Sequence, residues 1–164
     1  MASLRTFEEL VAIMDRLRDR GGCPWDREQT YATLRGYLIE ECYEVVDALD
    51  RADLPALCEE LGDLLFQIVF LARLAGEDRA FAAADVVEGI AAKMIRRHPH
   101  VFGDDSVTSA AQVLVRWEEI KKTEKRDALR PEADDSVLSG IPPALPALVK
   151  AQRLGTKAAR VGFD

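Results

Sequence analysis

Cysteine is scarce in this chain, and its spacing excludes a disulfide-stapled or zinc-stabilised fold. The three cysteines, Cys23, Cys42 and Cys58, show no Cys-x-x-Cys pattern, and any disulfide scheme leaves one of them unpaired. We therefore expect a reducing compartment and no structural zinc. The first residues include acids where a signal peptide needs an apolar core, so the sequence predicts a cytoplasmic location.

Long hydrophobic runs and a surplus of basic residues are also missing. The most apolar segment, residues 64–72, is too short to span a bilayer. The net charge of −7 argues against a general nucleic-acid-binding protein, because such proteins neutralise phosphates with excess Lys and Arg. We expect a soluble domain whose partners include neither a membrane nor nucleic acid.

No β-alternation stands out, whereas apolar residues recur at helical spacing along most of the chain. The spacing predicts helices over residues 4–20, 30–50, 53–74, 81–97, about 106–120 and 148–160, with a polar loop at 23–29. Asp53 is the expected N-cap of the third helix, and Pro55 is tolerated in its first turn. We predict an all-α helical bundle: a domain over residues 1–125 and a C-terminal arm with a short basic helix over 126–164.

The acidic residues are unevenly distributed. Between residues 36 and 72 the only base is Arg51, and the acids are Glu40, Glu41, Glu44, Asp47, Asp50, Asp53, Glu59, Glu60 and Asp63. Ordinary solvated helices mix the two signs of charge, because i,i+4 acid–base pairs are mildly stabilising and like pairs are not. This stretch is therefore the first candidate for a functional site.

Helical geometry sorts the acids of residues 30–50. The expected core stripe is Leu34, Leu38, Cys42, Val45 and Leu49. Counted from Leu38, Glu41 and Glu44 fall about 60° and 120° to one side, so they border the core. By the same count Glu40 and Asp47 fall on the far side, roughly 160° to 180° away.

The next predicted helix has a similar polar strip. Its expected apolar positions are Leu57, Leu61, Leu64, Leu65, Ile68 and Ala72. Counted from Leu61, the residues Glu60, Asp63 and Gln67 fall about 100° to 160° to one side. Carboxylates in a strip enclosed by apolar faces cost several kcal/mol each unless a positive charge meets them.

Ligand chemistry narrows the identity of that positive charge. A di-iron carboxylate bundle needs Glu-x-x-His, and neither acidic helix contains a histidine. All-oxygen sites suit Mg²⁺ or Mn²⁺, and Mg²⁺ is typically shared between protein carboxylates and substrate phosphates. The alternative is a plain helical scaffold whose acids are solvated.

Two basic pairs downstream could meet an anionic substrate. Lys93 and Arg97 are four residues apart, as are Trp117 and Lys121, so each pair shares a helix face. The bases could neutralise phosphates, and Trp117 could stack on a nucleobase. The alternative is structural: cations in a last helical turn favourably meet the helix dipole, and a tryptophan on an amphipathic helix usually packs in the core.

In the order of its motifs the chain resembles the MazG-type nucleoside triphosphate pyrophosphohydrolases. The matching blocks cover nearly the whole chain: Gly22-Cys23-Pro24-Trp25-Asp26 with Gln29-Thr30, Glu40-Glu41 with Glu44, Glu60-Leu61-Gly62-Asp63, Arg96-Arg97-His98-Pro99-His100-Val101-Phe102, Trp117 to Lys121, Ile141-Pro142 with Leu145-Pro146-Ala147-Leu148, and Val161-Gly162-Phe163-Asp164.

The resemblance implies an all-α NTP pyrophosphatase bundle, assembled as a homodimer or higher oligomer. It implies Mg²⁺-dependent hydrolysis of an NTP or dNTP to the monophosphate and pyrophosphate, and both house-cleaning of the nucleotide pool and control of a nucleotide alarmone fit the family. The implied metal ligands are Glu41, Glu44, Glu60 and Asp63, with Glu40 or Glu41 assisting the attacking water. The implied phosphate and nucleotide contacts are Lys93, Arg97, Trp117 and Lys121. The alternative is a non-catalytic nucleotide-sensing or dimerisation module that kept the fold.

Overall fold

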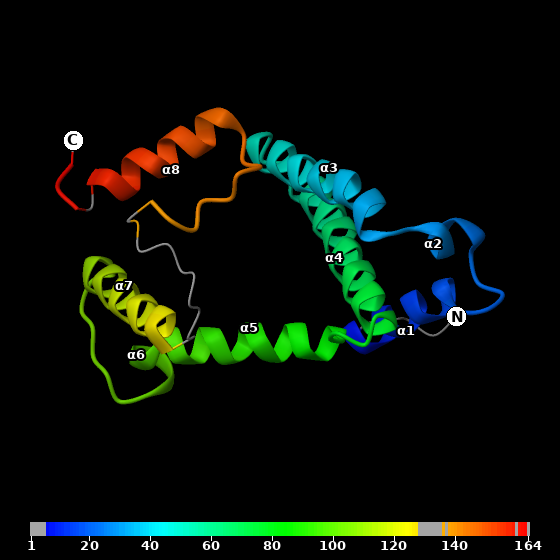
Figure 1. The fold of residues 1–164 in the computed structure, drawn as a ribbon, viewed down its shortest axis with the longest axis horizontal. Helices are drawn as coiled ribbons and strands as arrows, with labels where there is room; N and C mark the ends of the chain where they lie inside the picture. The colour runs from blue at the N-terminus through cyan, green and yellow to red at the C-terminus, as the bar shows by residue number, and fades with distance from the viewer. Residues whose placement is uncertain (1–5, 128–135, 137, 160, 164) are drawn as a thin grey trace. The chain divides into compact units, whose positions relative to one another are not determined.

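The computed structural model describes residues 6–127, 136, 138–159 and 161–163, and these ranges contain helices and no strand (Figure 1). The helices are α1 (Phe7–Arg18), α2 (Pro24–Glu28), α3 (Tyr31–Asp50), α4 (Leu54–Glu77), α5 (Ala83–Arg97), α6 (Pro99–Phe102), α7 (Ala110–Asp127) and α8 (Ala147–Ala159). The prediction of an all-α fold is confirmed. None of the helices in the described ranges combines the length and hydropathy of a membrane span.

Capping residues define the helix ends much as the sequence indicates. Thr30 caps α3, and the side chain of Asp53 caps α4 by accepting a hydrogen bond from Ala56 N at 3.1 Å. Two short helices were not predicted. Both α2 and α6 begin at a proline, Pro24 and Pro99, whose fixed φ is already suited to a first helical turn.

Contacts divide the chain into two compact units, Met1–Arg96 and Arg97–Asp164. We call them the N-terminal and C-terminal units. The predicted division at residue 125 stays a prediction, and the predicted linker of residues 126–146 lies partly outside the described residues.

The N-terminal unit is organised around the helical hairpin of α3 and α4. The two helices are joined by residues 51–53 and run side by side (Figure 1), while α1 contacts both α4 and α2. The core cluster consists of Met14, Leu34, Val69, Phe70 and Leu74. It therefore lies where α1 meets the first residues of α3 and the second half of α4.

The buried face of α3 differs from the predicted stripe. Cys42 is exposed and Leu49 is 56% exposed, so these two positions were wrongly assigned to the core. The least exposed residues of α3 are Leu34, Leu38, Glu41, Val45 and Ala48. Their alternating spacing of four and three is that of a coiled-coil seam, and it places Glu41 on the seam itself.

The buried face of α4 is narrower than its apolar surface. Leu61, Leu65 and Ile68 are among the expected apolar positions and are 49%, 38% and 41% exposed in the single chain. The buried or half-buried positions with seam spacing are Leu57, Glu60, Leu64, Gln67, Leu71 and Leu74. Because α4 is apolar nearly all round, periodicity alone does not identify the side that meets α3.

Arg18 fastens the segment between α1 and α3 to the rest of the unit. Its guanidinium bonds both carboxylate oxygens of Glu77 at 2.8 Å, donates to the backbone oxygens of Asp26 and Gln29, and lies 5.4 Å from the centre of the Phe70 ring. Because Asp26 and Gln29 belong to the segment that leads into α3, Arg18 fixes the position from which α3 starts.

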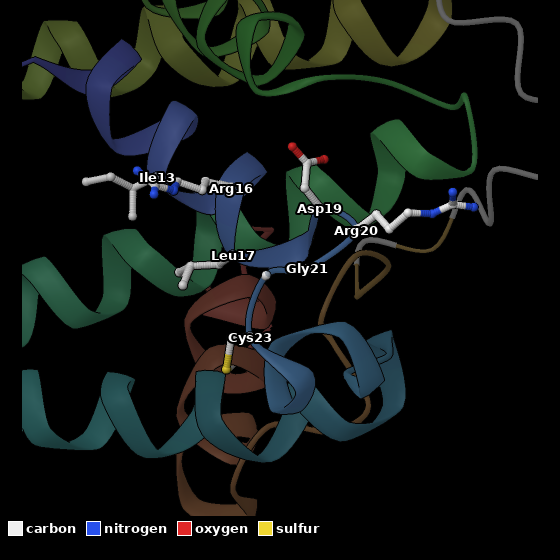
Figure 2. Close-up of a pocket in the computed structure, with 8 residues that line it drawn as sticks. Ile13, Arg16, Leu17, Asp19, Arg20, Gly21 and Cys23 are labelled. Carbon is white, nitrogen blue, oxygen red and sulfur yellow. The ribbon is translucent and has the colours of Figure 1, made fainter.

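Gly22 makes the tight exit from α1 possible. A Cβ at this position would lie 2.2 Å from the backbone oxygen of Leu17, so no other residue fits without moving the backbone. Figure 2 shows the pocket beside this loop, with Leu17 on α1, Cys23 beyond the glycines, and Arg16 and Arg20 extending in different directions. The pocket residues include none of the predicted site residues.

Candidate active site

Three acidic side chains converge between α3 and α4. Glu41 of α3 and Glu60 and Asp63 of α4 each offer a carboxylate oxygen, and these oxygens lie within 4.8 Å of one another. The hairpin explains why these side chains lie close together. Glu41 and Asp63 are equally far along the chain from Ala52 in the connection, so they come to the same level of the two antiparallel helices. We call Glu41, Glu60 and Asp63 the carboxylate cluster.

Burial and neighbouring acids disfavour the charged form of the carboxylate cluster. Burial raises the pKa of Glu41, and a side-chain hydrogen bond with Glu44 and the charge of Asp63 raise it further. Burial likewise raises the pKa of Glu60, with the charge of Glu44 as the next cause, while Arg51 acts in the opposite direction. The site therefore holds more negative charge than its own surroundings compensate.

The donor set of the cluster fits a hard divalent cation. All three groups are carboxylates on helices, and hard cations such as Mg²⁺ and Mn²⁺ prefer oxygen ligands. A cation there would favour the ionised carboxylates and so lower both raised pKa values.

The other predicted acids lie around the cluster. Glu44 is exposed and reaches Glu41 through their side-chain hydrogen bond. Glu40 is exposed on α3. Asp47 pairs at 3.0 Å with Arg51, the C-cap residue of α3.

Three of the four predicted substrate-binding residues meet in the C-terminal unit. Trp117 donates its indole N–H to the backbone oxygen of Arg97 at 2.8 Å, and the Lys121 ammonium lies 5.5 Å from the centre of the Trp117 ring. The Arg97 guanidinium is already bonded to Glu124 at 2.7 Å, which raises the pKa of Arg97. Lys93 is half-buried one turn before Arg97 on α5.

The fold and the motif order agree with known proteins. A family model described as a MazG nucleotide pyrophosphohydrolase domain matches residues 29–102. The structure is similar to the crystal structure of a mazG-related protein from Thermotoga maritima, with a TM-score of 0.60 and 30% identity, covering 70% of this chain and 98% of that chain. The chain belongs to the MazG family.

Longer MazG relatives are more similar still in sequence. The chain is 48% identical over 162 residues to a nucleoside triphosphate pyrophosphohydrolase of Escherichia coli strain K12, covering 98% of this chain and 60% of the relative. It is 48% identical over 158 residues to the nucleoside triphosphate pyrophosphohydrolase/pyrophosphatase MazG of Thermotoga maritima, covering 96% of this chain and 58% of the relative. The chain thus spans about three fifths of the length of these curated relatives.

The sequence analysis assigned no role to three residues on or next to the helices that bear the carboxylate cluster. Trp25 and Tyr37 meet edge to face, with ring centres 5.7 Å apart, and are 49% and 40% exposed. Tyr37 lies one turn before Glu41 on α3, and this i,i+4 spacing is the signal that could have identified it. Gln67 was placed on the polar strip without a role, and it is buried.

Proposed function

We propose that this MazG chain hydrolyses nucleoside triphosphates, NTP or dNTP, to the monophosphate and pyrophosphate in a Mg²⁺-dependent reaction at the carboxylate cluster. The observation that supports it most strongly is the convergence of carboxylate oxygens of Glu41, Glu60 and Asp63 within 4.8 Å, at a hairpin seam where burial disfavours the charges of Glu41 and Glu60. The names of the longer relatives support the choice of reaction.

The acidic residues have separate roles in this proposal. Glu41, Glu44, Glu60 and Asp63 hold Mg²⁺, for which Mn²⁺ can substitute. When bound, the cation supplies charge neutralisation on the phosphates and on the leaving pyrophosphate. Glu40 or Glu41 accepts the proton of the attacking water as general base.

The basic and aromatic residues bind the rest of the nucleotide. Lys93, Arg97 and Lys121 offset phosphate charge, and Trp117 contacts the nucleotide. Because Arg97 is paired with Glu124, phosphate binding requires that pair to open or to be shared. Tyr37 lies one turn before Glu41 on α3 and meets Trp25 of α2 edge to face, and these exposed rings offer the nucleobase a further stacking surface.

The proposal includes a homodimer or higher homo-oligomer in the cytoplasm, with house-cleaning of the nucleotide pool as the role. A second copy would cover the apolar stripe of α4 that the single chain exposes, which we define as Leu54, Cys58, Leu61, Leu65 and Ile68 and call the α4 stripe.

A product assay tests the proposed reaction. Purified protein is incubated with each NTP and dNTP and Mg²⁺, and phosphorus NMR follows the products. We expect monophosphate and pyrophosphate, and we expect Glu60→Gln and Asp63→Asn to lower kcat at least about 100-fold with unchanged helicity, because a carboxylate that would hold the cation is lost. Glu88→Gln, an exposed acid of α5, is the control. Diphosphate with orthophosphate as products would exclude the reaction.

A second candidate is a non-catalytic nucleotide-sensing or dimerisation module. The observation that favours it is that Arg97, Trp117 and Lys121 already bond with neighbouring side chains and backbone. It predicts that a non-hydrolysable NTP with Mg²⁺ raises the melting temperature while no NTP is turned over.

A further inference from the structure

Gln67 is a buried polar residue in the middle of α4. It is 8% exposed, and its side-chain oxygen Oε1 has no hydrogen-bond partner among the described residues. A buried acceptor without a donor costs about 1–3 kcal/mol, and native proteins rarely leave one unpaired. The position therefore implies a donor that the folded chain does not itself supply.

The surroundings of Gln67 explain why no donor is present. Its neighbours on the same side of α4 are Leu64, Phe70 and Leu71, which have no side-chain donors, and Asp63, whose ionised carboxylate can only accept. The backbone N–H groups of a helix interior are already used within the helix. These neighbours on α4 therefore leave the position open to a donor that comes from outside the helix, such as a bound ligand or its water.

The location of Gln67 indicates which ligand supplies that donor. It lies two turns after Glu60 on the seam and one turn after Asp63, which borders the seam. Side chains of a helix lean toward its N-terminus, so the Gln67 amide leans over the turn that bears Asp63. Bound Mg²⁺ usually keeps several waters, and a cation-bound water is a strong hydrogen-bond donor.

We propose that Gln67 is a positioning residue of the cation site: its Oε1 accepts a hydrogen bond from a water on the cation held by Glu41, Glu60 and Asp63. The inference rests on the cation site of the proposed function. It gives a role to a residue outside the acidic motif. The buried amide of Gln67 holds one water of the site in place, and this helps to orient the residues that hold the cation.

The role has a consequence that a purely structural glutamine would not have. Gln67→Met keeps the length and apolar stem of the side chain and removes the unpaired acceptor. The metal-free protein should become more stable, because the cost of burying that acceptor disappears, while cation binding should become weaker. Stability and affinity should thus change in opposite directions.

The test measures both quantities on the full chain with Mn²⁺ as the probe. Electron paramagnetic resonance of free Mn²⁺ gives the Kd, and circular dichroism in EDTA gives the melting temperature. For Gln67→Met we expect a Kd raised about 10-fold or more and a melting temperature raised by about 2–4 °C. Gln67→Glu, which retains an acceptor oxygen, should bind Mn²⁺ at least as tightly as the parent.

Leu64→Met is the matched control, because it alters packing one turn away on the same seam without removing an acceptor. Its Kd for Mn²⁺ should stay within about twofold of the parent. The inference is overturned if Gln67→Met binds Mn²⁺ like the parent, if it melts below the parent in EDTA, or if Gln67→Glu binds as weakly as Gln67→Met. If the parent binds Mn²⁺ but the Gln67 variants do not behave as expected, only the role of Gln67 is refuted. If the parent binds no Mn²⁺, the cation site of the proposed function is refuted as well.

Discussion

Glu41 and Glu60 lie at seam positions of the α3–α4 hairpin, and the seam positions one turn away on either side are leucine or valine. Burial raises the pKa of both, so each weakens the metal-free fold at neutral pH compared with an apolar residue. With a cation bound between them, the two carboxylates would instead stabilise the fold. Helical angles counted from the sequence predicted that Glu41 and Glu60 belong to one acidic site. They did not predict that both lie on the seam, because that depends on which side of α4 meets α3.

The ion pair of Arg18 and Glu77 should make stability depend on pH. The hydrogen bond from Arg18 lowers the pKa of Glu77, against the opposing effect of burial. An acid whose pKa is lower in the folded state stabilises the fold above its unfolded pKa, and this contribution is lost as the pH falls through the folded pKa.

Urea unfolding of Glu77→Gln from neutral to acidic pH checks this expectation. At pH 7 we expect the free energy of unfolding to fall by about 1–3 kcal/mol, because the buried guanidinium loses its charged partner. The difference from the parent should shrink below roughly pH 4, where glutamate becomes protonated. Glu88→Gln is again the control. A difference that stays constant with pH would mean that the charge of Glu77 is not the cause.

The helix ends of the hairpin depend on unusual backbone conformations. Ala52 has φ 52° in the connection between α3 and α4, and Ala52 N and Asp53 N bond Leu49 O and Ala48 O at 3.0 Å. This is a Schellman ending, in which glycine is the usual residue at the left-handed position. The caps Thr30 and Asp53 were predictable from residue type, whereas alanine at a left-handed position carries no such signal.

Two opposite glycine substitutions test the backbone account. Ala52→Gly should raise the free energy of unfolding by about 1 kcal/mol, because glycine adopts positive φ without a steric cost. Gly22→Ala should lower it by at least about 1 kcal/mol, because the added Cβ would lie 2.2 Å from Leu17 O. Gly155→Ala, in open space on α8, is the control and should be neutral or stabilising. Chemical denaturation measures all three; a destabilised Ala52→Gly would contradict the account.

Few large apolar side chains of the single chain are fully buried, and many are exposed. The α4 stripe repeats at intervals of three and four residues, and Ile39, Tyr43 and Val46 form a similar exposed series on α3. Exposed apolar surface of this kind marks interaction sites. A single sequence gives the same periodicity for a core face and for an interface, so it could not tell which apolar residues of α3 and α4 face the core, and Cys42 and Leu49 were wrongly placed there.

Sedimentation equilibrium tests whether a second copy covers the α4 stripe. The parent should have at least twice the mass of one chain, and Leu65→Arg should reduce it to one chain at micromolar concentration, because an unpaired charge in an apolar interface costs several kcal/mol. Leu148→Arg, at a leucine that is 86% exposed on α8, should keep the parent mass. A Leu65→Arg protein with the parent mass would remove the stripe as the interface.

The central claim is that Glu41, Glu60 and Asp63 together hold a divalent cation. Crystals of the full chain grown with Mn²⁺, with diffraction data collected at the manganese absorption edge, test it most directly. The account predicts an anomalous peak coordinated by carboxylate oxygens of all three residues. Anomalous density that lies away from all three carboxylates, or no peak at saturating Mn²⁺, would contradict it.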